Sequence, residues 1–447
     1  MTSSFSKTPV EFAAWDILTR GYDVDETLPV WIDCDPGHDD AFALVLALHH
    51  PRLRVLGVST VDGNAPLRCT TRNALRMLAA CGVRDVKVYA GASAPLLRYS
   101  TETVVLTDGM DGGDALRDEN GMEVGEALRR RRRHPARIHG DGGMDLLGMD
   151  SPWPSEDYGA RCLGEQPAVE AMAHIIAVEY ARLNAPAAHG GARATDTSGC
   201  RNHVMQAVFG DAGDAAVPPS VSSPRKVKIV ACGPLTNIAL LLSVYEHLVP
   251  MVDVVVLGGA LVAPGNVTPL AEFNVHHDPE AFALVIHAGI QHVVLVPLEV
   301  THTVVADERI VQRWADLHSI FGDVVAALVR FYNERYRKTY GMAAACLHDP
   351  VAVAAVFGIA LGKYRVSHEC VRVETMPRTM CRGKVVVVDR WRGVTPNVYV
   401  AHAVDTEWFW AELMGAVQRA DAVSPLNIGR MEKVECDIGV GRDEESR

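Results

Sequence analysis

The sequence predicts an α/β fold, in which one large, open and mostly parallel sheet is covered by helices on both faces. Short apolar segments with strand character alternate with longer amphipathic segments, which is typical of parallel sheets. Polar residues cluster directly after several of the apolar segments, and ligands of such sheets bind at the carboxyl ends of the strands. The 447 residues and 48% hydrophobic content suffice for one large domain or two smaller ones.

The expected elements support this fold class one after another. Segments rich in Val, Ile and Leu predict strands at residues 30–34, 53–58, 87–89, 226–231, 252–257 and 293–297. Between them, apolar residues at helical spacing predict helices at 41–49, 68–81, 167–182, 235–242, 279–287 and 322–337. Near the end of the chain, strands are expected at 371–375 and 384–389, and a closing helix at 406–419.

Two segments interrupt this alternation. Residues 101–136 are rich in Gly, Asp and Arg, and residues 184–224 in Ala, Gly, Ser and Pro. Both are expected to be surface insertions that are partly disordered, are the most mobile parts of the chain and supply no metal ligand. We expect one domain at 28–420, an N-terminal extension at 1–27 and a C-terminal tail at 421–447.

Composition and charge argue against several classes of function. The net charge of −12 and the pI of about 5.8 argue against a general nucleic-acid or anionic-membrane binder. The basic run at 129–134 is interpreted as a solvated part of the first insertion in preference to a polyanion site. Ten scattered cysteines without a CxxC pair fit reduced thiols. No apolar run reaches transmembrane length and no secretion signal is visible, so we expect a cytoplasmic protein.

Residues 29–45 carry the strongest functional signal. A predicted strand ends in Asp33 and Asp35, whose period-two spacing puts both carboxylates on the same side of the strand end. A Pro-Gly turn follows, and Asp39 and Asp40 then begin an apolar helical pattern. Helix capping and the helix dipole explain two acids at such a turn, but four acids repel one another unless a cation lies among them. Oxygen ligands of this kind suit Ca²⁺ or Mg²⁺ and not zinc.

Other polar residues follow the predicted strands in the same way. Asn64, in a Gly-Asn pair, comes after the second strand, although a turn residue explains it equally well. His139 precedes a Gly-rich loop, which would allow close backbone approach to a ligand. Cys232 begins a Cys-Gly-Pro-Leu-Thr-Asn turn whose exposed carbonyls could bind a hard cation.

A further group lies in the second half of the chain. Asn266, Glu272 and Asn274 fall within nine residues of one loop and suit a polyhydroxylated ligand, with an ordinary polar loop as the alternative. His348 and Asp349 lie in an otherwise apolar stretch, where a buried acid needs a partner. A role as a further metal carboxylate would supply that partner, and a helix N-cap is compatible with it.

Taken together, these residues resemble the inosine-uridine preferring nucleoside hydrolase family. The run Asp-Cys-Asp-Pro-Gly-His-Asp-Asp-Ala is highly specific to that family, and the Gly-Asn, His-Gly, Gly-Pro-Leu-Thr-Asn, Glu-Phe-Asn and His-Asp-Pro elements follow in its order over roughly residues 28–420, apart from the insertions. The resemblance implies a nucleoside hydrolase fold with a Rossmann-like core, and hydrolysis of ribonucleosides to ribose and free base in purine and pyrimidine salvage. It also implies a Ca²⁺ that contacts the ribose 2′- and 3′-hydroxyls, a nucleoside as the partner molecule, and a homo-oligomer.

The resemblance implies a metal site made of four groups. Asp35, Asp40, Asp349 and the backbone carbonyl of Cys232 would hold Ca²⁺. The family often has Thr in place of this cysteine, but a carbonyl ligand does not depend on the side chain. Asp35 would also be the general base, because the bound cation keeps its carboxylate ionised and lowers the pKa of the attacking water.

The same resemblance implies the sugar contacts. Asp33 and Asp39 would orient the metal ligands and a ribose hydroxyl. Four further side chains with amide or carboxyl groups would bind the sugar hydroxyls: Asn64, Asn266, Glu272 and Asn274. Hydroxyl contacts and nearby negative charge suit an oxocarbenium-like transition state, because both can strengthen as positive charge builds on the ring.

The base would lie against His139 and His348. His348 would be the acid for the departing base, since imidazole titrates near neutral pH. A His directly before the last metal Asp resembles the non-specific or pyrimidine-accepting branch of the family. Tyr332 and Tyr336, one helical turn apart, resemble tyrosines near the base, although one face of an amphipathic helix explains them equally well. The first insertion ends just before the His139 loop, which leaves the base preference open.

Two alternatives are compatible with part of the sequence. Asp33 and Asp35 after a strand also resemble haloacid-dehalogenase-like phosphatases. That interpretation needs a downstream Lys and acidic pair that cannot be placed, and it leaves the Glu-Phe-Asn and His-Asp-Pro elements unexplained. The second alternative is a non-catalytic homologue that binds a nucleoside or Ca²⁺, and release of free base would distinguish it from an enzyme.

Overall fold

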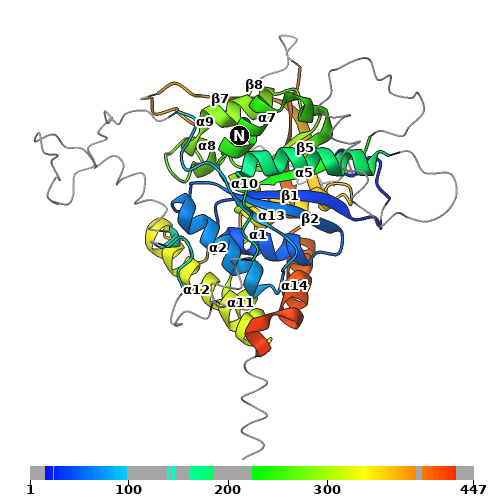
Figure 1. Cartoon of the computed structure of the whole chain (residues 1–447). Coiled ribbons are helices and arrows are strands. Elements are labelled where there is room, and N and C mark those ends of the chain that lie inside the picture. The colour runs from blue at the N-terminus through cyan, green and yellow to red at the C-terminus, as the bar shows by residue number, and fades with distance from the viewer. Residues whose placement is uncertain are drawn as a thin grey trace, which may run out of the picture.

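In the computed structural model, nine strands of the described residues form one sheet (Figure 1). The described residues are 16–23, 25–97, 138–140, 142–146, 153, 161–185, 224–377, 379–388 and 395–428. The strands are β1 (Leu28–Cys34), β2 (Leu53–Thr60), β3 (Val88–Ala90), β4 (Val227–Ala231), β5 (Val252–Leu257), β6 (Val293–Val296), β7 (Tyr364–Val373), β8 (Val385–Val388) and β9 (Val398–Val404).

The order of the strands places a crevice at the carboxyl end of β1. The sheet runs β3-β2-β1-β4-β5-β6-β9-β7-β8. Strands β1 to β6 and β9 pair in parallel, whereas β7 is antiparallel to both β9 and β8. The chain winds outward from β1 in one direction through β2 and β3, and in the other through β4, β5 and β6. Such a reversal of strand order is where ligands bind in open parallel sheets.

Helices cover both faces of the sheet (Figure 1). One face is packed against α5, α7 and α9, and the other against α1, α2, α13 and α14. The helices are α1 (His38–His49), α2 (Leu67–Ala80), α5 (Ala168–Leu183), α7 (Thr236–Val244), α8 (Phe273–His277), α9 (Pro279–His287), α10 (Leu298–Thr301), α11 (Glu308–Ala315), α12 (Ile320–Tyr340), α13 (Asp349–Gly358) and α14 (Thr406–Val423), with 3₁₀ turns η1 (Glu246–Met251) and η3 (Pro425–Asn427).

Strand β1 is buried along its whole length and contributes to both hydrophobic cores. Val30 and Ile32 belong to the core beneath α1 and α13, whereas Trp31 belongs to the core beneath α5 and α7. Successive side chains of a strand point to opposite faces, so a strand covered on both sides is apolar at every position. This explains why β1 reads as a continuous apolar run until the acids begin at Asp33.

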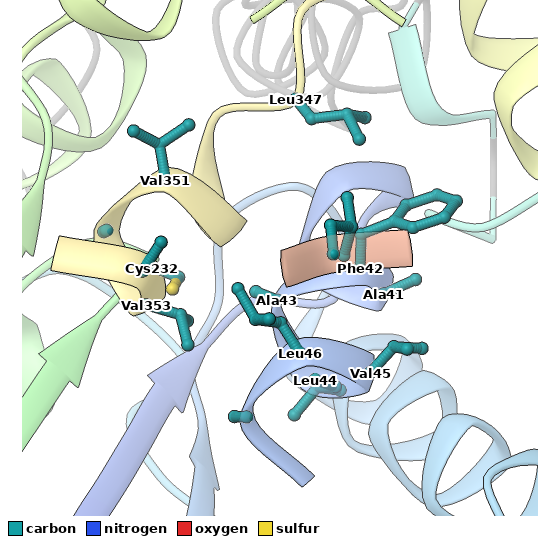
Figure 2. Packing of buried hydrophobic residues seen from close by; sticks show 14 of the residues in the cluster. Ala41, Phe42, Ala43, Leu44, Val45, Leu46, Cys232, Leu347, Val351 and Val353 are labelled. Atoms are coloured by element: carbon teal, nitrogen blue, oxygen red, sulfur yellow. The ribbon is translucent and has the colours of Figure 1, made fainter. Parts of the chain in front are cut away.

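Helices α1 and α13 pack against each other at the carboxyl end of the sheet. Every residue of α13 is buried, and so are the residues of α1 from His38 to Ala47. Figure 2 shows Phe42 and Leu46 of α1 in this core, with Val351 and Val353 of α13 and the side chain of Cys232 beside them. Because the packing of both helices is tight, the amino end of α13 has a fixed position relative to that of α1.

The expected alternation of parallel strands and helices is confirmed, with differences near the end of the chain. The strand at 398–404 was not expected, although it connects the parallel part of the sheet to β7. The short helices α8, α10 and α11 were not expected either. In the described part of the chain, no helix is long and apolar enough to span a membrane. The expected insertion at 101–136 lies outside the described residues, as does all but the ends of the one at 184–224.

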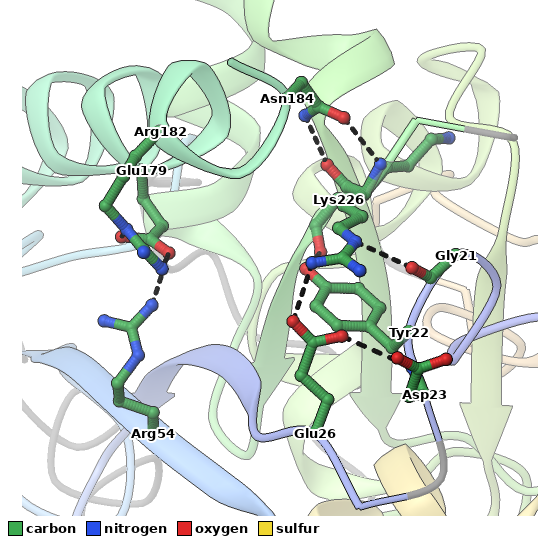
Figure 3. A network of polar contacts seen from close by, with 10 residues as sticks. Gly21, Tyr22, Asp23, Glu26, Arg54, Glu179, Arg182, Asn184 and Lys226 are labelled. Atoms are coloured by element: carbon green, nitrogen blue, oxygen red, sulfur yellow. Dashed lines mark hydrogen bonds and ion pairs between the residues drawn. The ribbon is translucent and has the colours of Figure 1, made fainter. Parts of the chain in front are cut away.

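The two ends of the second insertion are held together by hydrogen bonds (Figure 3). The side chain of Asn184 accepts a hydrogen bond from the backbone N–H of Arg225 and donates one to its carbonyl, both at 2.9 Å. Arg225 also pairs with Glu26 at 2.6 Å, and Tyr22 donates to the carbonyl of Lys226 at 3.0 Å. The segment just before β1 and the start of β4 therefore form one polar network, at the end of the sheet opposite the acids.

Candidate active site

The turn after β1 is organised by Asp40. One Asp40 oxygen accepts the backbone N–H of Asp35 at 3.2 Å, and the other accepts that of Gly37 at 2.9 Å. A carboxylate in the first turn of a helix is favoured by the free N–H groups and the helix dipole. Gly37 allows this turn to form, because a Cβ there would lie 2.5 Å from Nδ1 of His139 and 2.8 Å from Nδ2 of Asn64.

Three buried carboxylates meet where α1 and α13 begin. Oxygens of Asp39, Asp40 and Asp349 all lie within 4.8 Å of one another. Asp349 is the first residue of α13, and His348, not Asp349, is the residue that precedes the helix as its N-cap. The three carboxylates that lie closest to one another therefore include Asp39, whereas the sequence predicts Asp35 together with Asp40 and Asp349.

Asp35 lies next to this group with one oxygen held and one without a partner. Its Oδ2 accepts the backbone N–H of Asn64 at 2.7 Å, whereas Oδ1 is buried and has no hydrogen-bond partner. A Cβ at Gly233 would lie 2.8 Å from this Oδ1, so Asp35 approaches the backbone just after Cys232. An unpartnered buried carboxylate oxygen is costly, and a cation is the natural partner for it.

Asp33 faces a different environment from the other acids of the motif. Its Oδ1 accepts hydrogen bonds from the Ser59 hydroxyl and, at 2.7 Å, from Nδ2 of Asn237, while its Oδ2 has no partner. Its backbone carbonyl accepts the N–H of Cys232 at 2.7 Å. Asp33 thus ties β1 to β2, β4 and α7 at the base of the site.

The carboxyl groups of Asp33, Asp35, Asp39 and Asp349 are buried, and within the described part of the chain their charged neighbours are other acids. Burial and repulsion from Asp40 raise the pKa of Asp39 from 3.8 to about 7, and burial raises the pKa of Asp33 to about 7. The same two causes raise the pKa values of Asp35 and Asp349 well above the ordinary value. Charged carboxylates at this density require a cation.

A second buried acid elsewhere in the sheet provides a contrast. Burial would raise the pKa of Asp253, but the ammonium of Lys228, 2.8 Å away, and the neighbouring His292 and Lys226 hold it below the ordinary value. At Asp253 the protein itself therefore supplies the cationic side chains that neutralise a buried carboxylate. At the end of β1 the described residues supply no such partner, and the oxygen-rich donor set fits Ca²⁺ or Mg²⁺.

The carbonyl of Cys232 points into the same site. It accepts a hydrogen bond from Nδ2 of Asn274 at 2.8 Å, and Cys232 lines the cavity together with Asp39 and Asp349. The Cys232 thiol packs against the carbonyl of Asp349 at 3.9 Å. The backbone after β4 thus meets the amino end of α13, as a shared ligand set requires.

The residues expected to bind the sugar are held by hydrogen bonds to the backbone or to another side chain of the site. Asn64 donates from Nδ2 to Asp40 at 3.1 Å. Asn266 accepts the N–H of Phe273 at 2.8 Å. Glu272 is the N-cap of α8 and accepts N–H groups of Gly259, residue 274 and residue 275 at 2.7–3.0 Å. These bonds orient the three side chains in advance, which lowers the cost of binding a ligand.

The residues that are expected to lie near the base are neighbours in the structure. The Tyr336 hydroxyl lies 2.7 Å from Nε2 of His348 and 3.3 Å from the Tyr332 hydroxyl, which bonds to the Asp39 carboxyl group. His139 lies with its Nδ1 3.2 Å from the backbone nitrogen of His38. Burial, together with repulsion from a neighbouring histidine, lowers the pKa of His348 to about 3, so its ring is neutral at pH 7.

One cavity brings most of the expected residues together. Asp33, Asp35 and Asp40 are not among the residues that line it, whereas all the other expected residues are. Those residues are Asp39, Asn64, His139, Cys232, Asn266, Glu272, Asn274, Tyr332, Tyr336, His348 and Asp349. Residues that are distant in the sequence thus converge at the switch point of the sheet.

Some site residues were not expected from the sequence. Tyr340 lines the cavity, and its spacing of four from Tyr336 could have indicated it. Asn237 belongs to the Gly-Pro-Leu-Thr-Asn element but was given no role, although it binds Asp33. Thr301, which contacts His348, lies in a segment with no distinguishing pattern.

The geometry of the site can be compared with known proteins. The sequence model of the family described as inosine-uridine preferring nucleoside hydrolase matches residues 30–411. The chain belongs to this family. A probable ribonucleoside hydrolase of Dictyostelium discoideum is 29% identical over 402 residues, which cover 88% of this chain and 95% of that protein. A pyrimidine-specific ribonucleoside hydrolase of Salmonella paratyphi B is 30% identical over 383 residues, which cover 86% of this chain and 96% of that protein.

Solved structures share the fold of this nucleoside hydrolase. A purine-preferring ribonucleoside hydrolase from Gardnerella vaginalis has a TM-score of 0.65 and 22% identity, and the match covers 88% of this chain and 99% of the other. An inosine-guanosine nucleoside hydrolase has a TM-score of 0.61 and 21% identity over 87% of this chain. At these identities the likeness shows the fold alone, and the predicted α/β fold class is confirmed.

Family membership also decides the general activity. The protein is a ribonucleoside hydrolase, an enzyme that cleaves N-glycosidic bonds. The alternative of a haloacid-dehalogenase-like phosphatase has no support, because the family match spans the chain from β1 into α14. In addition, Asp33, which would be the nucleophile of such a phosphatase, is not among the residues that line the cavity and accepts a hydrogen bond from Asn237.

Proposed function

We propose that this enzyme hydrolyses ribonucleosides with the help of a bound Ca²⁺, that it accepts uridine as well as inosine, and that it serves nucleoside salvage in the cytoplasm as a homo-oligomer. One observation carries the metal part of the proposal. Buried acids that follow β1 and begin α13 lie together, and two of them, Asp39 and Asp349, line one cavity with Cys232, without a basic side chain among their described contacts. A cation would balance the negative charge of these acids when they are ionised.

Four groups would hold the Ca²⁺: Asp35, Asp40, Asp349 and the carbonyl of Cys232. When bound, the cation would supply positive charge that orients two sugar hydroxyls and makes a nearby water more acidic. Asp39 would contact a ribose hydroxyl, because it belongs to the acid cluster and also lines the cavity. The expected sugar-binding side chains Asn64, Asn266, Glu272 and Asn274 line the same cavity.

Asp35 would act as the general base. Its Oδ2 is oriented by the N–H of Asn64, and its Oδ1 is free to accept a proton. The carboxylate would take one proton from the attacking water as the oxygen bonds to C1′ and the C1′–N bond breaks. Negative charge beneath the ring would stabilise the positive charge that develops on the sugar.

His348 would give a proton to the departing base. Its ring lines the cavity beside Tyr336, and its Nε2 faces the Tyr336 hydroxyl. In this structure the pKa of His348 is about 3 because the ring is buried. Negative charge that builds on the departing base would favour the protonated ring, since an opposite charge raises the pKa of a histidine.

The proposed preference for the base depends on two observations. A His occupies the position before the last metal acid, which resembles the pyrimidine-accepting branch of the family. The Salmonella relative at 30% identity is named pyrimidine-specific. His139 and the tyrosines of α12 surround the expected position of the base with ring faces and polar edges that suit a planar heterocycle.

A panel of nucleosides tests the proposal. The purified protein is incubated with uridine, cytidine, inosine, adenosine and 2′-deoxyuridine, with either Ca²⁺ or EDTA, and free ribose or deoxyribose is measured. We expect release from uridine and inosine with Ca²⁺, little release from the deoxynucleoside, and none with EDTA. Release that persists after complete removal of the metal would contradict the metal part. The absence of release from every nucleoside would favour the non-catalytic alternative.

A further inference from the structure

The side chain of Thr301 is the partner of His348 on the side away from the cavity. Its hydroxyl lies 2.7 Å from Nδ1 of His348, whereas Nε2 of the same ring lies 2.7 Å from the hydroxyl of Tyr336. Tyr336 and His348 line the cavity, and Thr301 is fully buried behind the ring. The two nitrogens of the ring therefore have different surroundings, one facing the site and one facing the protein interior.

The direction of the Thr301 hydrogen bonds follows from the count of protons. A hydroxyl has one proton to donate and can accept as well. The Thr301 hydroxyl donates to the carbonyl of Leu298, one helical turn earlier, at 3.2 Å. Both contacts can be hydrogen bonds at once only if this oxygen accepts from the ring, and that arrangement places a hydrogen on Nδ1 of His348. With the hydrogen of the neutral ring on Nδ1, Nε2 has none, so the Tyr336 hydroxyl donates to Nε2 at 2.7 Å.

We propose that Thr301 is a positioning residue that holds His348 in the Nδ1–H tautomer and thereby makes Nε2 the nitrogen that exchanges a proton on the cavity side. If Nδ1 lost its partner, the neutral ring could carry its proton on Nε2 and leave Nδ1 bare. The ring would then gain its next proton at Nδ1, against the interior, where no departing base can reach it. The role of a histidine depends in this way on the partner of its other nitrogen.

The predicted effect of Thr301 on kcat rests on the proposed function, whereas the predicted tautomer of His348 does not. His348 acts as the proton donor to the base only if the enzyme cleaves nucleosides as proposed above. The tautomer of its ring is a property of the protein without substrate. The two can therefore be measured separately, and one can fail while the other holds.

The test compares three substitutions. Thr301→Val keeps the shape and removes the hydroxyl, and Thr301→Ser restores the hydroxyl. Thr303→Val is the matched control, because Thr303 also donates to a carbonyl one turn earlier, at 2.6 Å to Val300, but has no bond to His348. The protein is labelled with ¹⁵N-histidine, and the His348 signals are identified by their loss in His348→Gln. The ¹⁵N shifts then report which ring nitrogen carries the proton.

We expect an Nδ1–H tautomer in the wild type, in Thr301→Ser and in Thr303→Val, and a shift toward the Nε2–H tautomer in Thr301→Val. We also expect Thr301→Val to lower kcat for uridine on the order of 10²-fold, the lower end of what a positioned proton donor contributes. Its KM for uridine and its kcat for a p-nitrophenyl riboside, whose leaving group needs no proton, should change less than about twofold, because the sugar contacts remain.

Three results would overturn the proposal. An Nε2–H tautomer in the wild type would do so, and this measurement needs no variant. An unchanged tautomer in a folded Thr301→Val, or an equal loss of kcat on both substrates, would show that the threonine only fills space. If the wild type released no ribose from any nucleoside, the proposed function would fail instead, and the NMR comparison would still decide the role of Thr301 in setting the tautomer.

Discussion

At the scale of single residues, Asp35 combines two features that a general base needs. One oxygen is fixed by the backbone of Asn64 at 2.7 Å, and the other is buried without a partner beside Gly233. A fixed carboxylate with a free lone pair can accept a proton without reorganising, which is the condition for efficient proton transfer. The same free oxygen suits a metal ligand, so a substitution affects both roles.

Substituting Asp35 by Asn should nearly abolish hydrolysis. The amide keeps the size of the side chain but cannot accept a proton as the carboxylate does, and it is a weaker metal ligand. The loss of kcat should therefore exceed the roughly 10²–10⁴-fold that a general base alone contributes. The measurement is ribose release from uridine, with Asp62→Asn as control, because Asp62 is partly exposed and lies 3.5 Å from His277. Turnover close to that of the wild type in folded Asp35→Asn would count decisively against the assignment.

Substituting His348 by Ala should affect substrates according to their leaving group. Uracil and hypoxanthine leave more easily when protonated, so hydrolysis of uridine and inosine should slow by on the order of 10²-fold or more. A p-nitrophenyl riboside needs no proton and should be cleaved at nearly the wild-type rate. His302→Ala is the matched control, because this ring lies 5.8 Å from that of His348 but does not line the cavity. Equal losses on both substrates would show that His348 only shapes the pocket.

The sequence predicted site residues well where they belong to a recognisable motif. It predicted them poorly where their role is to contact and orient a residue of such a motif. Asp39, Asp40 and Asp349 stand out because acids are rare in apolar surroundings, and the structure brings them together. Thr301 does not stand out, because its role depends on a contact with His348, 47 residues later in the chain. Which acids lie closest to one another also depends on side-chain rotamers, and a sequence does not specify these.

At the scale of elements, the site depends on helix starts and strand ends. Helix α1 begins at the turn after β1, α13 begins at Asp349, and α8 is capped by Glu272. Each start supplies free N–H groups that orient acidic side chains. Alternating apolar runs predicted the parallel strands that carry these starts. They did not predict β9, because one face of Val398–Val404 has a His among three Val residues and the other face has only a Tyr and two Ala residues.

The second insertion should be dispensable for metal binding. Its ends, Asn184 and Arg225, are joined by two hydrogen bonds of 2.9 Å, so a short Gly-Ser linker in place of residues 186–223 can close the chain. Loop closure depends only weakly on length, at about 0.6 kcal/mol per doubling. We expect the affinity for Ca²⁺, measured by calorimetry, and kcat on uridine to remain within about twofold of the wild type, since additive effects are expected for distant sites.

A second variant makes the deletion test sharper. Arg225→Ala removes the pair with Glu26 and should lower the free energy of unfolding, since that pair is half-buried and closes the polar network of Figure 3. It should leave Ca²⁺ affinity unchanged, because the network lies at the opposite end of the sheet from Asp35. Complete loss of Ca²⁺ affinity in a folded deletion variant would contradict the expectation that the insertion supplies no ligand.

At the scale of the whole molecule, the strand order determines where charge accumulates. The sheet reverses its order between β1 and β4, and the acids lie at the carboxyl ends of these strands. At the opposite ends of the strands, Lys226 and Lys228 compensate the buried Asp253. The buried acid at one end of the sheet thus has cationic side chains beside it, whereas the acids at the other end have none among the described residues. The chain as a whole also has an excess of acidic residues, with a net charge of −12.

This asymmetry predicts how stability depends on pH and on Ca²⁺. In the protein without metal, the pKa values of Asp33 and Asp39 rise from 3.8 to about 7 on folding, mainly because both are buried. Between these pH values the native state binds more protons than the unfolded chain, so the free energy of unfolding decreases as the pH rises from about 4 to about 7. If Ca²⁺ binds the ionised acids of the folded protein as proposed, it replaces those protons, and its stabilising effect should increase over the same range.

The expected outcome is a Tm difference between Ca²⁺ and EDTA samples that is larger at pH 8 than at pH 5, measured by scanning calorimetry. At a Ca²⁺ concentration of about 100 times Kd, the stabilisation should reach about 2.7 kcal/mol. Asp349→Asn is the control, because removal of one ligand should reduce the Ca²⁺ effect at both pH values. It should also flatten the pH dependence of the EDTA sample, since one of the mutually repelling acids is gone. A Ca²⁺ effect that is equal at both pH values, or larger at pH 5, would mean that the buried acids do not exchange their protons for the cation.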